Sequence, residues 1–147
     1  MARIRGRCPR GERLIAKVPH GHWKTTTLVA ALDLSGVRCS MQIEGAIDAA
    51  SFESFIEQVL APTLKPGEIV VMDNLSSHKG VRIRELIEAR SATLVYLPPY
   101  SPDLNPIELA FSKIKQLLRT LAARTKDALW SAMQGVLDNV TSSDAVG

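Results

Sequence analysis

The sequence predicts an α/β fold in which helices cover a β-sheet. Strand-like apolar runs alternate with segments whose apolar residues recur at helical spacing, in the order strand, helix, strand, helix. With 147 residues, 46% of them hydrophobic, the chain is long enough for one core and too short for two full domains. We therefore expect one domain at residues 24–140, between a basic arm or loop at residues 1–23 and a tail at residues 141–147.

The first elements are predicted from β-branched runs and turn residues. Residues 1–23 are rich in Arg and Gly and show no sustained periodicity, which indicates an extended arm or a loose hairpin. Residues 24–34 and 37–43 are apolar and β-branched, and Ser35 and Gly36 between them suit a turn. This pattern predicts a β-hairpin.

The middle of the chain predicts a helix, a strand and a second helix. Asp48 can cap a helix that ends near Pro62. Residues 68–72 indicate a fully buried strand, and residues 79–90 a helix that covers the sheet. The expected buried side chains of the two helices are Phe52, Phe55, Ile56, Val59 and Leu60, then Ile83, Leu86 and Ile87.

The last third predicts a strand followed by two helices. Residues 92–97 indicate the strand, and the prolines of residues 98–102 then form a rigid connection that cannot start as a helix. A long helix is expected with Asn105 as its N-cap, and Thr125 caps the next one. Their expected inward residues are Ile107, Phe111, Ile114, Leu118 and Leu121, then Leu129, Trp130, Met133, Leu137 and Val140, before the chain frays into a polar end.

The net charge is only +3, but the basic residues are concentrated in two segments. Residues 1–24 hold seven Lys or Arg residues against one acid, Glu12, and residues 109–126 hold five with no acid. Such segments suit a polyanion such as nucleic acid, although a solvated basic surface explains them equally well.

The composition argues against disulfide frameworks and membrane spans. Cys8 and Cys39 belong to no CxxC pair, so neither a disulfide framework nor a zinc site is indicated, and a cytoplasmic location fits best. The longest apolar runs are about five residues, whereas a membrane-spanning helix needs about 20. We therefore expect no membrane segment.

Two carboxylates carry the functional prediction. Asp73 directly follows the apolar run at residues 69–72, and Glu108 follows after 34 intervening residues. An acid that leaves a strand lies at the carboxyl edge of the sheet, where open α/β sheets bind ligands. With a glutamate in the first turn of a later helix it can bind a divalent metal, because hard cations prefer carboxylate oxygens on rigid supports. We predict that Asp73 and Glu108 are catalytic metal ligands for two-metal phosphodiester chemistry.

Each carboxylate also has a purely structural explanation. Asp73, followed by Asn74, can form an Asx turn or cap the next element. Glu108 occupies the third position after Asn105 and can complete a capping box. Both alternatives remain open at the level of sequence.

Glu108 begins a polar helix face that carries basic residues. Ser112, Lys115 and Arg119 follow it at steps of four, three and four, opposite the apolar stripe. We interpret this face, together with Lys113, as a surface for DNA phosphates beside the metal ligands.

Three residues outside this helix are further candidates for DNA contacts. His78, five residues after Asp73, can contact a phosphate or help to start the next helix, and Lys79 follows it. Tyr100, beside the proline turn, is expected to be exposed and able to stack on a base.

Several other residues are not assigned to the site. His20 and His22 form an HxH pair, but no Cys or His cluster accompanies them, so we assign no zinc there. Trp23 and Tyr96 are expected to serve packing. Asp33 ends a predicted strand of the hairpin, and we do not treat it as a catalytic acid.

Two segments then carry a specific resemblance. The strings VVMDNLSSH at residues 70–78 and LPPYSPDLNPIE at residues 97–108 resemble the catalytic domain of DDE-type transposases of bacterial insertion sequences, on the branch related to mariner elements. The resemblance extends from about residue 6 to about residue 140.

This resemblance implies a ribonuclease-H-like fold, a central mixed sheet flanked by helices, in which three carboxylates gather two Mg²⁺ ions, or Mn²⁺. Asp73 would be the second acid and Glu108 the third. The implied reaction is cleavage of DNA at the ends of the transposon, followed by attack of the freed 3′-hydroxyl on target DNA.

The chain also departs from this family pattern. In similar proteins the first catalytic Asp lies on the first strand. The match of this sequence to the family pattern begins after that strand, which implies an N-terminally truncated domain that lacks it. We therefore expect little or no nuclease activity from the chain alone. Its implied partners are DNA and either a second copy or a companion fragment that supplies the strand and the Asp.

Two other functions are compatible with the sequence. One is a noncatalytic DNA-binding or regulatory transposase remnant. The other is a ribonuclease-H-like nuclease acting on RNA-containing hybrids, against which the proline-rich signature argues.

Overall fold

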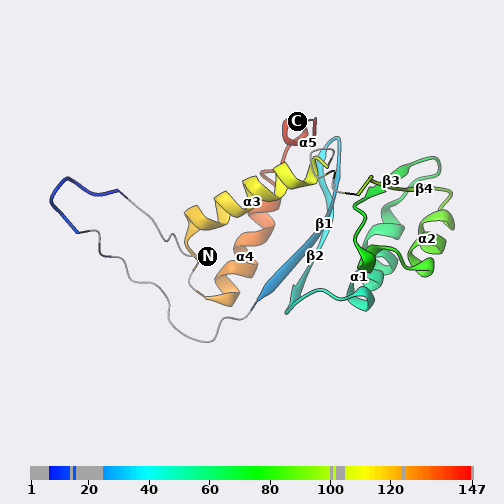
Figure 1. The fold of residues 1–147 in the computed structure, drawn as a ribbon, viewed down its shortest axis with the longest axis horizontal. Coiled ribbons are helices and arrows are strands. Elements are labelled where there is room, and N and C mark those ends of the chain that lie inside the picture. The colour runs from blue at the N-terminus through cyan, green and yellow to red at the C-terminus, as the bar shows by residue number, and fades with distance from the viewer. Residues whose placement is uncertain are drawn as a thin grey trace.

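The β1–β2 hairpin lies between two groups of helices (Figure 1). The computed structural model describes residues 7–13, 15, 25–99, 101, 105–123 and 125–146. The strands are β1 (Thr26–Asp33), β2 (Gly36–Glu44), β3 (Ile69–Met72) and β4 (Thr93–Tyr96). The α-helices are α1 (Ala49–Phe55), α2 (Val81–Glu88), α3 (Ile107–Leu121), α4 (Lys126–Leu137) and α5 (Ser142–Val146).

The predicted hairpin is confirmed. β1 and β2 pair in antiparallel register from Thr26 opposite Glu44 to Asp33 opposite Gly36. The register shifts after Ala31, which leaves Arg38 as the additional residue of a β-bulge. Because a bulge redirects its extra residue, Arg38 reaches out of the ladder: its Nη1 lies 3.0 Å from Glu68, just before β3, and its Nη2 donates to the Thr63 carbonyl.

The predicted helix after Asp48 is confirmed, with an unexpected continuation. The Asp48 side chain accepts a hydrogen bond from the Ser51 N–H at 2.8 Å, which caps α1. The chain continues through a π-helical turn, η1 (Ile56–Leu60), and a 3₁₀ turn, η2 (Ala61–Thr63). Helical periodicity alone does not predict the change from α-helix to π-helix. Of the five side chains that we expected to be buried in this segment, four are buried: Phe52, Phe55, Ile56 and Leu60.

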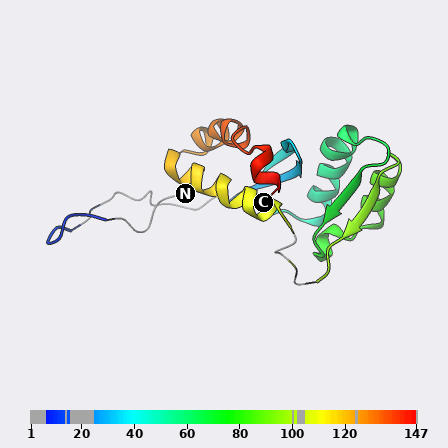
Figure 2. The same cartoon turned by 90° about the horizontal axis from the view of Figure 1, so that it is seen from above.

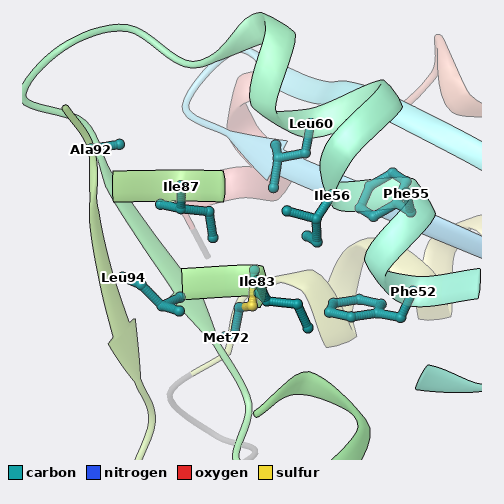
Figure 3. Packing of buried hydrophobic residues seen from close by; sticks show 9 residues of the cluster. All are labelled: Phe52, Phe55, Ile56, Leu60, Met72, Ile83, Ile87, Ala92 and Leu94. Carbon is teal, nitrogen blue, oxygen red and sulfur yellow. The ribbon is translucent and has the colours of Figure 1, made fainter. Parts of the chain in front are cut away.

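These side chains form the larger of two hydrophobic clusters. They meet Met72 of β3, Ile83 and Ile87 of α2, and Ala92 and Leu94 beside and within β4 (Figure 3). The predicted helix at residues 79–90 and strand at residues 92–97 are thereby confirmed, with shorter bounds.

The expected central sheet is divided in the structure. Within the described residues, β1 pairs with β2, and β3 pairs in parallel with β4, as two separate two-stranded sheets. Neighbouring strands of one sheet lie about 4.8 Å apart, whereas a cavity separates β1 from β3. The prediction of one mixed sheet is therefore corrected to two small sheets.

The prediction of a fully buried strand at residues 68–72 is wrong on one face. Met72 is buried, but Ile69 is 66% exposed and Val71 is 54% exposed. Alternate residues of a strand point to opposite faces, so β3 contacts the core through Val70 and Met72 only. The unbroken apolar run of residues 69–72 therefore led to a prediction of more burial than the strand has.

The long helix α3 starts and packs slightly differently from the prediction. It begins at Ile107 with Pro106 at the N-cap position, so the expected Asn105 cap is displaced by one residue. Ile114 and Leu118 are buried as expected, joined by Ala110, but Leu121 is 57% exposed. Leu121 is the last helical residue, and the left-handed Ala122 that follows, with φ of 49°, turns the chain away.

The predicted cap of α4 is confirmed, because the Thr125 hydroxyl accepts a hydrogen bond from the Ala128 N–H at 3.1 Å. Helix α4 packs on α3 to form the second cluster. Its buried members are Ala110, Ile114 and Leu118 of α3, with Met133, Val136, Leu137 and Val140 in and after α4.

The expected frayed end is instead an ordered short helix. Thr141 forms an isolated bridge with Gly36, and Ala145 of α5 is buried. Asp144 accepts a hydrogen bond from Lys113 Nζ at 2.7 Å, which ties α5 to α3. The polar composition of this segment concealed these tertiary contacts.

The hairpin contributes to both clusters, which explains the unbroken apolar run at residues 28–32 of β1. Leu28 and Leu32 pack against the α3–α4 cluster, and Val29 and Ala31 pack against the larger cluster. Figure 2 shows the same arrangement from above, with α3 and α4 on one side of the hairpin and α1, α2, β3 and β4 on the other.

The structure also bears on the predictions about membrane spans and cysteines. No helix in the described part of the chain is long and apolar enough to cross a bilayer. Cys8 and Cys39 are free thiols, and burial raises the pKa of Cys39.

Candidate metal and DNA site

Asp73 is held at the carboxyl end of β3 by two contacts on one oxygen. Its Oδ1 accepts a hydrogen bond from the Leu75 N–H at 3.2 Å and lies 2.5 Å from His78 Nδ1. The first contact is the Asx-type turn that a structural explanation of Asp73 predicts. Among the described residues nothing is bonded to the second oxygen, Oδ2. The turn therefore orients this carboxylate and leaves one oxygen available.

His78 is part of this support. It ends a 3₁₀ turn, η3 (Ser76–His78), and its ring stacks on Phe52 with the centroids 3.9 Å apart. The Tyr96 hydroxyl donates a hydrogen bond to the His78 carbonyl at 2.7 Å. The His78 side chain is 18% exposed. The geometry favours a role in orienting Asp73 over a direct phosphate contact.

Glu108 lies exposed in the first turn of α3. The N-cap position is occupied by Pro106, whose side chain cannot accept a hydrogen bond, so α3 does not begin with the capping box that the sequence allowed for Asn105 and Glu108. A negative charge here is favourable because the amino end of a helix carries partial positive charge. The helix thus positions the Glu108 carboxylate, and this carboxylate takes no part in capping the helix.

The structure brings Asp73 and Glu108 to the same pocket, of about 390 Å³. Asn105 lies between them in sequence and also lines it, as do the residues that follow β3 and β4. The remaining lining residues are Asn74, Leu75, Leu97, Pro98, Pro99 and Ser101. The proline segment after β4 therefore forms one wall of the acid pocket and connects β4 to α3.

The donor set of this pocket fits a hard divalent cation. Asp73 and Glu108 offer carboxylate oxygens, and Asn74 and Asn105 offer amide oxygens, which are the ligands that Mg²⁺ and Mn²⁺ prefer. No cluster of three or more Asp, Glu, His or Cys side chains suited to a metal occurs in the part of the chain described. These residues thus supply a partial coordination set.

The basic face of α3 is exposed next to Glu108, as predicted. Ser112, Lys115 and Arg119 are all exposed. Lys113 differs, because it is half-buried and paired with Asp144. We therefore separate Lys113 from the DNA-contact candidates.

Lys79 is exposed at the end of η3. Tyr100 lies outside the described residues, as do His20, His22 and Trp23. Asp33 accepts hydrogen bonds from the Ser35 N–H at 2.7 Å and the Ser35 hydroxyl at 2.5 Å, which lower its pKa. It serves the hairpin turn, and the acid pocket does not include it.

Sequence reasoning missed the two asparagines of the pocket. Asn74 was considered only as part of a turn, and Asn105 only as a helix cap, yet both line the acid pocket. The signal was available, since each asparagine lies next to or near a candidate acid, in Asp73-Asn74 and in the segment from Asn105 to Glu108.

The fold is similar to that of two solved Mos1 structures, which agrees with the expected ribonuclease-H-like fold. The chain is similar to the Mos1 strand transfer complex, with a TM-score of 0.74 and 19% identity over 96% of this chain and 44% of that one. It also matches the catalytic domain of the Mos1 mariner transposase, with a TM-score of 0.64 and 17% identity over 82% of this chain and 65% of that one.

Residues 1–130 match the family described as DDE superfamily endonuclease, and the chain belongs to this family. It is 26% identical to the Tc1 transposase of Caenorhabditis elegans over 97 residues, which are 63% of this chain and 36% of that protein. It is 26% identical to the Tcb2 transposase of Caenorhabditis briggsae over 106 residues, 69% and 39% of the two chains. The chain thus spans less than half the length of these relatives.

Proposed function

We propose that this chain forms part of the catalytic domain of a DNA transposase, which cleaves DNA strands and transfers them with the help of Mg²⁺. The observation that carries this proposal is the meeting of Asp73 and Glu108, separated by 34 intervening residues in sequence, in one pocket beside a basic helix face. Membership of the DDE endonuclease family supports it.

In this proposal Asp73 and Glu108 hold the metal, and Asn105 helps to shape its surroundings. When bound, Mg²⁺ or Mn²⁺ would supply charge stabilisation and activate the attacking water or hydroxyl at a phosphodiester. His78 keeps the Asp73 carboxylate in one orientation through its Nδ1, so that Oδ2 points away from the Asx turn. Solved structures of Mos1 transposase include one with Mg and one with Mn, which supports the choice of metal.

DNA is the proposed substrate, as transposon ends and as target. Lys115 and Arg119 continue from Glu108 along the exposed face of α3, so a phosphate backbone near the acids could follow the helix. Lys79 lies exposed next to His78 on the Asp73 side. Solved Mos1 complexes include a paired-end complex with the left transposon end, which supports DNA ends as ligands.

We further propose that the isolated chain has little or no nuclease activity. The described residues gather two carboxylates at the pocket and no third acid. Two carboxylates leave a divalent cation weakly held and poorly placed for attack. A second copy or a companion polypeptide would then supply the remaining acid.

The test is metal binding measured separately from cleavage. Calorimetric titration with Mn²⁺ should detect binding to the wild-type chain, and Asp73→Asn or Glu108→Gln should each weaken it at least tenfold. Glu85→Gln is the matched control, because Glu85 is an exposed helical acid outside the pocket. Equal Mn²⁺ binding by all four proteins would refute the proposed site.

The second candidate is a noncatalytic DNA-binding or regulatory transposase remnant. The incomplete acid set next to an exposed basic helix face favours it. In that case DNA binding survives replacement of both Asp73 and Glu108 by Ala, and purified chain cuts no DNA in Mg²⁺ or Mn²⁺, even with a companion strand supplied. Cleavage that requires both carboxylates would exclude this candidate.

A further inference from the structure

We propose that Tyr96 is a positioning residue of the metal site, which acts on Asp73 through His78. The Tyr96 hydroxyl donates a hydrogen bond to the His78 carbonyl at 2.7 Å, and His78 Nδ1 lies 2.5 Å from Asp73 Oδ1. Two successive contacts thus connect the end of β4 to the carboxylate at the end of β3. The inference deepens the proposed function and rests on it, because it concerns the same metal site.

The backbone of Tyr96 is fixed next to Asp73. Tyr96 is the last residue of β4 and pairs in parallel register with Met72, the residue that precedes Asp73. The Leu97 N–H donates to the Met72 carbonyl at 2.8 Å, so the pairing of the two strands continues past Tyr96. Tyr96 and Asp73 are therefore attached to the same hydrogen-bonded ladder, which fixes the distance between their backbones.

The side chain of Tyr96 is also held along its length. The sequence predicts packing alone for this residue, and the ring does pack at the edge of the larger cluster. The ring also contacts Arg84 of α2, whose guanidinium carbon lies 5.9 Å from the ring centroid. Because a tyrosine side chain has few rotatable bonds, these contacts leave little freedom for the hydroxyl. Tyr96 therefore presents its hydroxyl from a rigid support.

The hydroxyl stabilises a short turn. The turn η3 contains three residues, and the His78 N–H donates to the Leu75 carbonyl at 3.0 Å. The Lys79 N–H donates to the Ser76 carbonyl at 3.3 Å. The last carbonyls of a helical turn find no partner inside that turn. At His78 the Tyr96 hydroxyl supplies this partner and so fixes the His78 backbone relative to β4.

The His78 ring is fixed by a different contact. It stacks on Phe52 of α1, with the ring centroids 3.9 Å apart and the ring planes inclined by 22°. Phe52 thus sets the plane of the imidazole, and Tyr96 sets the position of the backbone that carries it. With both fixed, Nδ1 is held against Asp73 Oδ1, so that the carboxylate keeps one orientation.

A metal site is sensitive to such support. Removal of a group that holds a metal ligand in place typically lowers metal affinity about 10- to 100-fold. Tyr96 acts one contact further out than His78, so the expected loss is smaller. If the hydroxyl only stabilises the fold, its removal lowers Tm and leaves metal affinity unchanged. The structural explanation and the positioning role therefore predict different results.

The first experiment removes the hydroxyl alone. Tyr96→Phe can keep the packing of the ring and its contact with Arg84. Calorimetric titration with Mn²⁺, well below the Tm, should show that affinity falls about threefold to tenfold relative to wild type. Equal Mn²⁺ affinity of Tyr96→Phe and wild type would overturn the proposal.

Thr27→Val is the matched control for this experiment. The Thr27 hydroxyl also donates to a backbone carbonyl, that of Gly45 at 2.6 Å, and Thr27 lies outside the acid pocket. The control should keep wild-type Mn²⁺ affinity although it loses a hydrogen bond of the same kind. A loss of affinity as large as that of Tyr96→Phe would mean that general destabilisation explains both, and would exclude a positioning role.

The second experiment tests the route through His78. His78→Phe removes the contact with Asp73 but keeps the backbone carbonyl that Tyr96 binds. In this background Tyr96→Phe should still lower Tm, and Mn²⁺ affinity should equal that of His78→Phe alone. A further loss of affinity in the double variant would mean that Tyr96 acts by another route, which contradicts the proposal.

The third experiment needs no metal and so separates this inference from the proposed function. A carboxylate can only accept hydrogen bonds, so the contact with Asp73 predicts the Nδ1–H tautomer for the neutral His78 imidazole. The ¹⁵N chemical shifts of the imidazole report the tautomer, and a spectrum of His78→Phe identifies the signals of His78. Tyr96→Phe should move these shifts towards the tautomer mixture of an unconstrained imidazole. Unchanged shifts would count against the proposal.

The combined results distinguish the two claims. A tautomer change in Tyr96→Phe, together with no Mn²⁺ binding by the wild-type chain, supports the link from Tyr96 to Asp73 and refutes the metal site. Mn²⁺ binding that is equal in wild type and Tyr96→Phe supports the metal site and refutes the role of Tyr96.

Discussion

Asp144, whose pKa is strongly lowered, lies away from the acid pocket. Asp144 accepts hydrogen bonds from Lys113 Nζ and from the Thr141 N–H, at 2.7 and 2.8 Å, and the Lys113 contact is the main cause that lowers its pKa to about 2. At the scale of single residues, the Asp144 carboxylate therefore ties α5 to Lys113 of α3.

A pH-dependent effect follows for Asp144→Asn. Because the folded pKa is depressed from 3.8 to about 2, the charged Asp144 stabilises the fold above about pH 4, and this stabilisation disappears as the pH falls towards 2. The variant should have a lower Tm than wild type at pH 7, and the difference should be much smaller near pH 2 and vanish below it. Asp138→Asn is the control, and a difference that persists undiminished at pH 2 would contradict the assignment.

His78 provides a second prediction at this scale, which depends on the proposed metal site. His78→Phe can keep the stack on Phe52 but loses the contact with Asp73, so Mn²⁺ affinity should fall about tenfold or more with little change in Tm. His78→Ala loses both contacts and should lower Tm as well. Calorimetry and thermal unfolding measure the two effects. Unchanged Mn²⁺ affinity in His78→Phe would rule out a positioning role.

At the scale of elements, the hairpin turn is constrained by the chain end that packs on it. Gly36 has a φ of +129°, and a Cβ added there would lie 2.3 Å from the Val140 carbonyl oxygen. Gly45 also has a positive φ, of +101°, but has open space around the corresponding position. Substitution of Gly45 therefore introduces backbone strain alone, whereas substitution of Gly36 introduces both strain and steric overlap.

Gly36→Ala should destabilise the protein by about 2 kcal/mol or more, since it combines strain with an overlap that backbone must absorb. Gly45→Ala should cost less, because strain alone acts there. Urea unfolding of both variants measures the difference. An equal loss for the two would mean that the contact between Gly36 and Val140 is unimportant.

Helix α3 gives a prediction about DNA binding. Lys115 and Arg119 are exposed beside Glu108, whereas Lys113 is paired with Asp144. Replacing Lys115 and Arg119 together by Gln should weaken DNA binding at low salt and reduce the salt slope by about 1 for each lost phosphate contact. Lys113→Gln should change Tm more than DNA affinity. Fluorescence anisotropy across a salt series tests both, and an unaltered slope in the double variant would refute this surface.

At the scale of the whole molecule, the hairpin couples the two hydrophobic clusters. Its residues pack against both clusters, so a substitution that loosens the packing of one cluster should also destabilise the other. Cooperative unfolding is expected despite the division of the strands into two sheets.

Ile56→Ala tests this coupling. Ile56 has no exposed surface, so the substitution should cost about 2–5 kcal/mol through lost burial and the cavity left behind. Hydrogen exchange should accelerate in α4 as well as in α1. Val81→Ala, at a residue that is 76% exposed, should change stability by less than about 0.5 kcal/mol. Faster exchange confined to α1 and its neighbours would indicate independent clusters.

Much of the fold was predictable, because its signals are local. The hairpin, the Asp48 and Thr125 caps, α2 and β4 each follow from periodicity or capping within a few residues. The errors arose where distant contacts decide. Ile69 and Val71 resemble core residues by composition, and the polar segment at residues 141–146 resembles a frayed end. Neither pattern contains information about what packs against it.

The candidate site divides in the same way. The residue types and spacing of Asp73 and Glu108 identified an acid pair and a family, because the chemistry of metal ligands and two long motifs are properties of the chain itself. The meeting of the two acids in one pocket, the orientation of Asp73 by His78, the pairing of Lys113 with Asp144 and the cavity between β1 and β3 depend on contacts between residues far apart in sequence. Such contacts form only when the elements pack, so local periodicity could not reveal them.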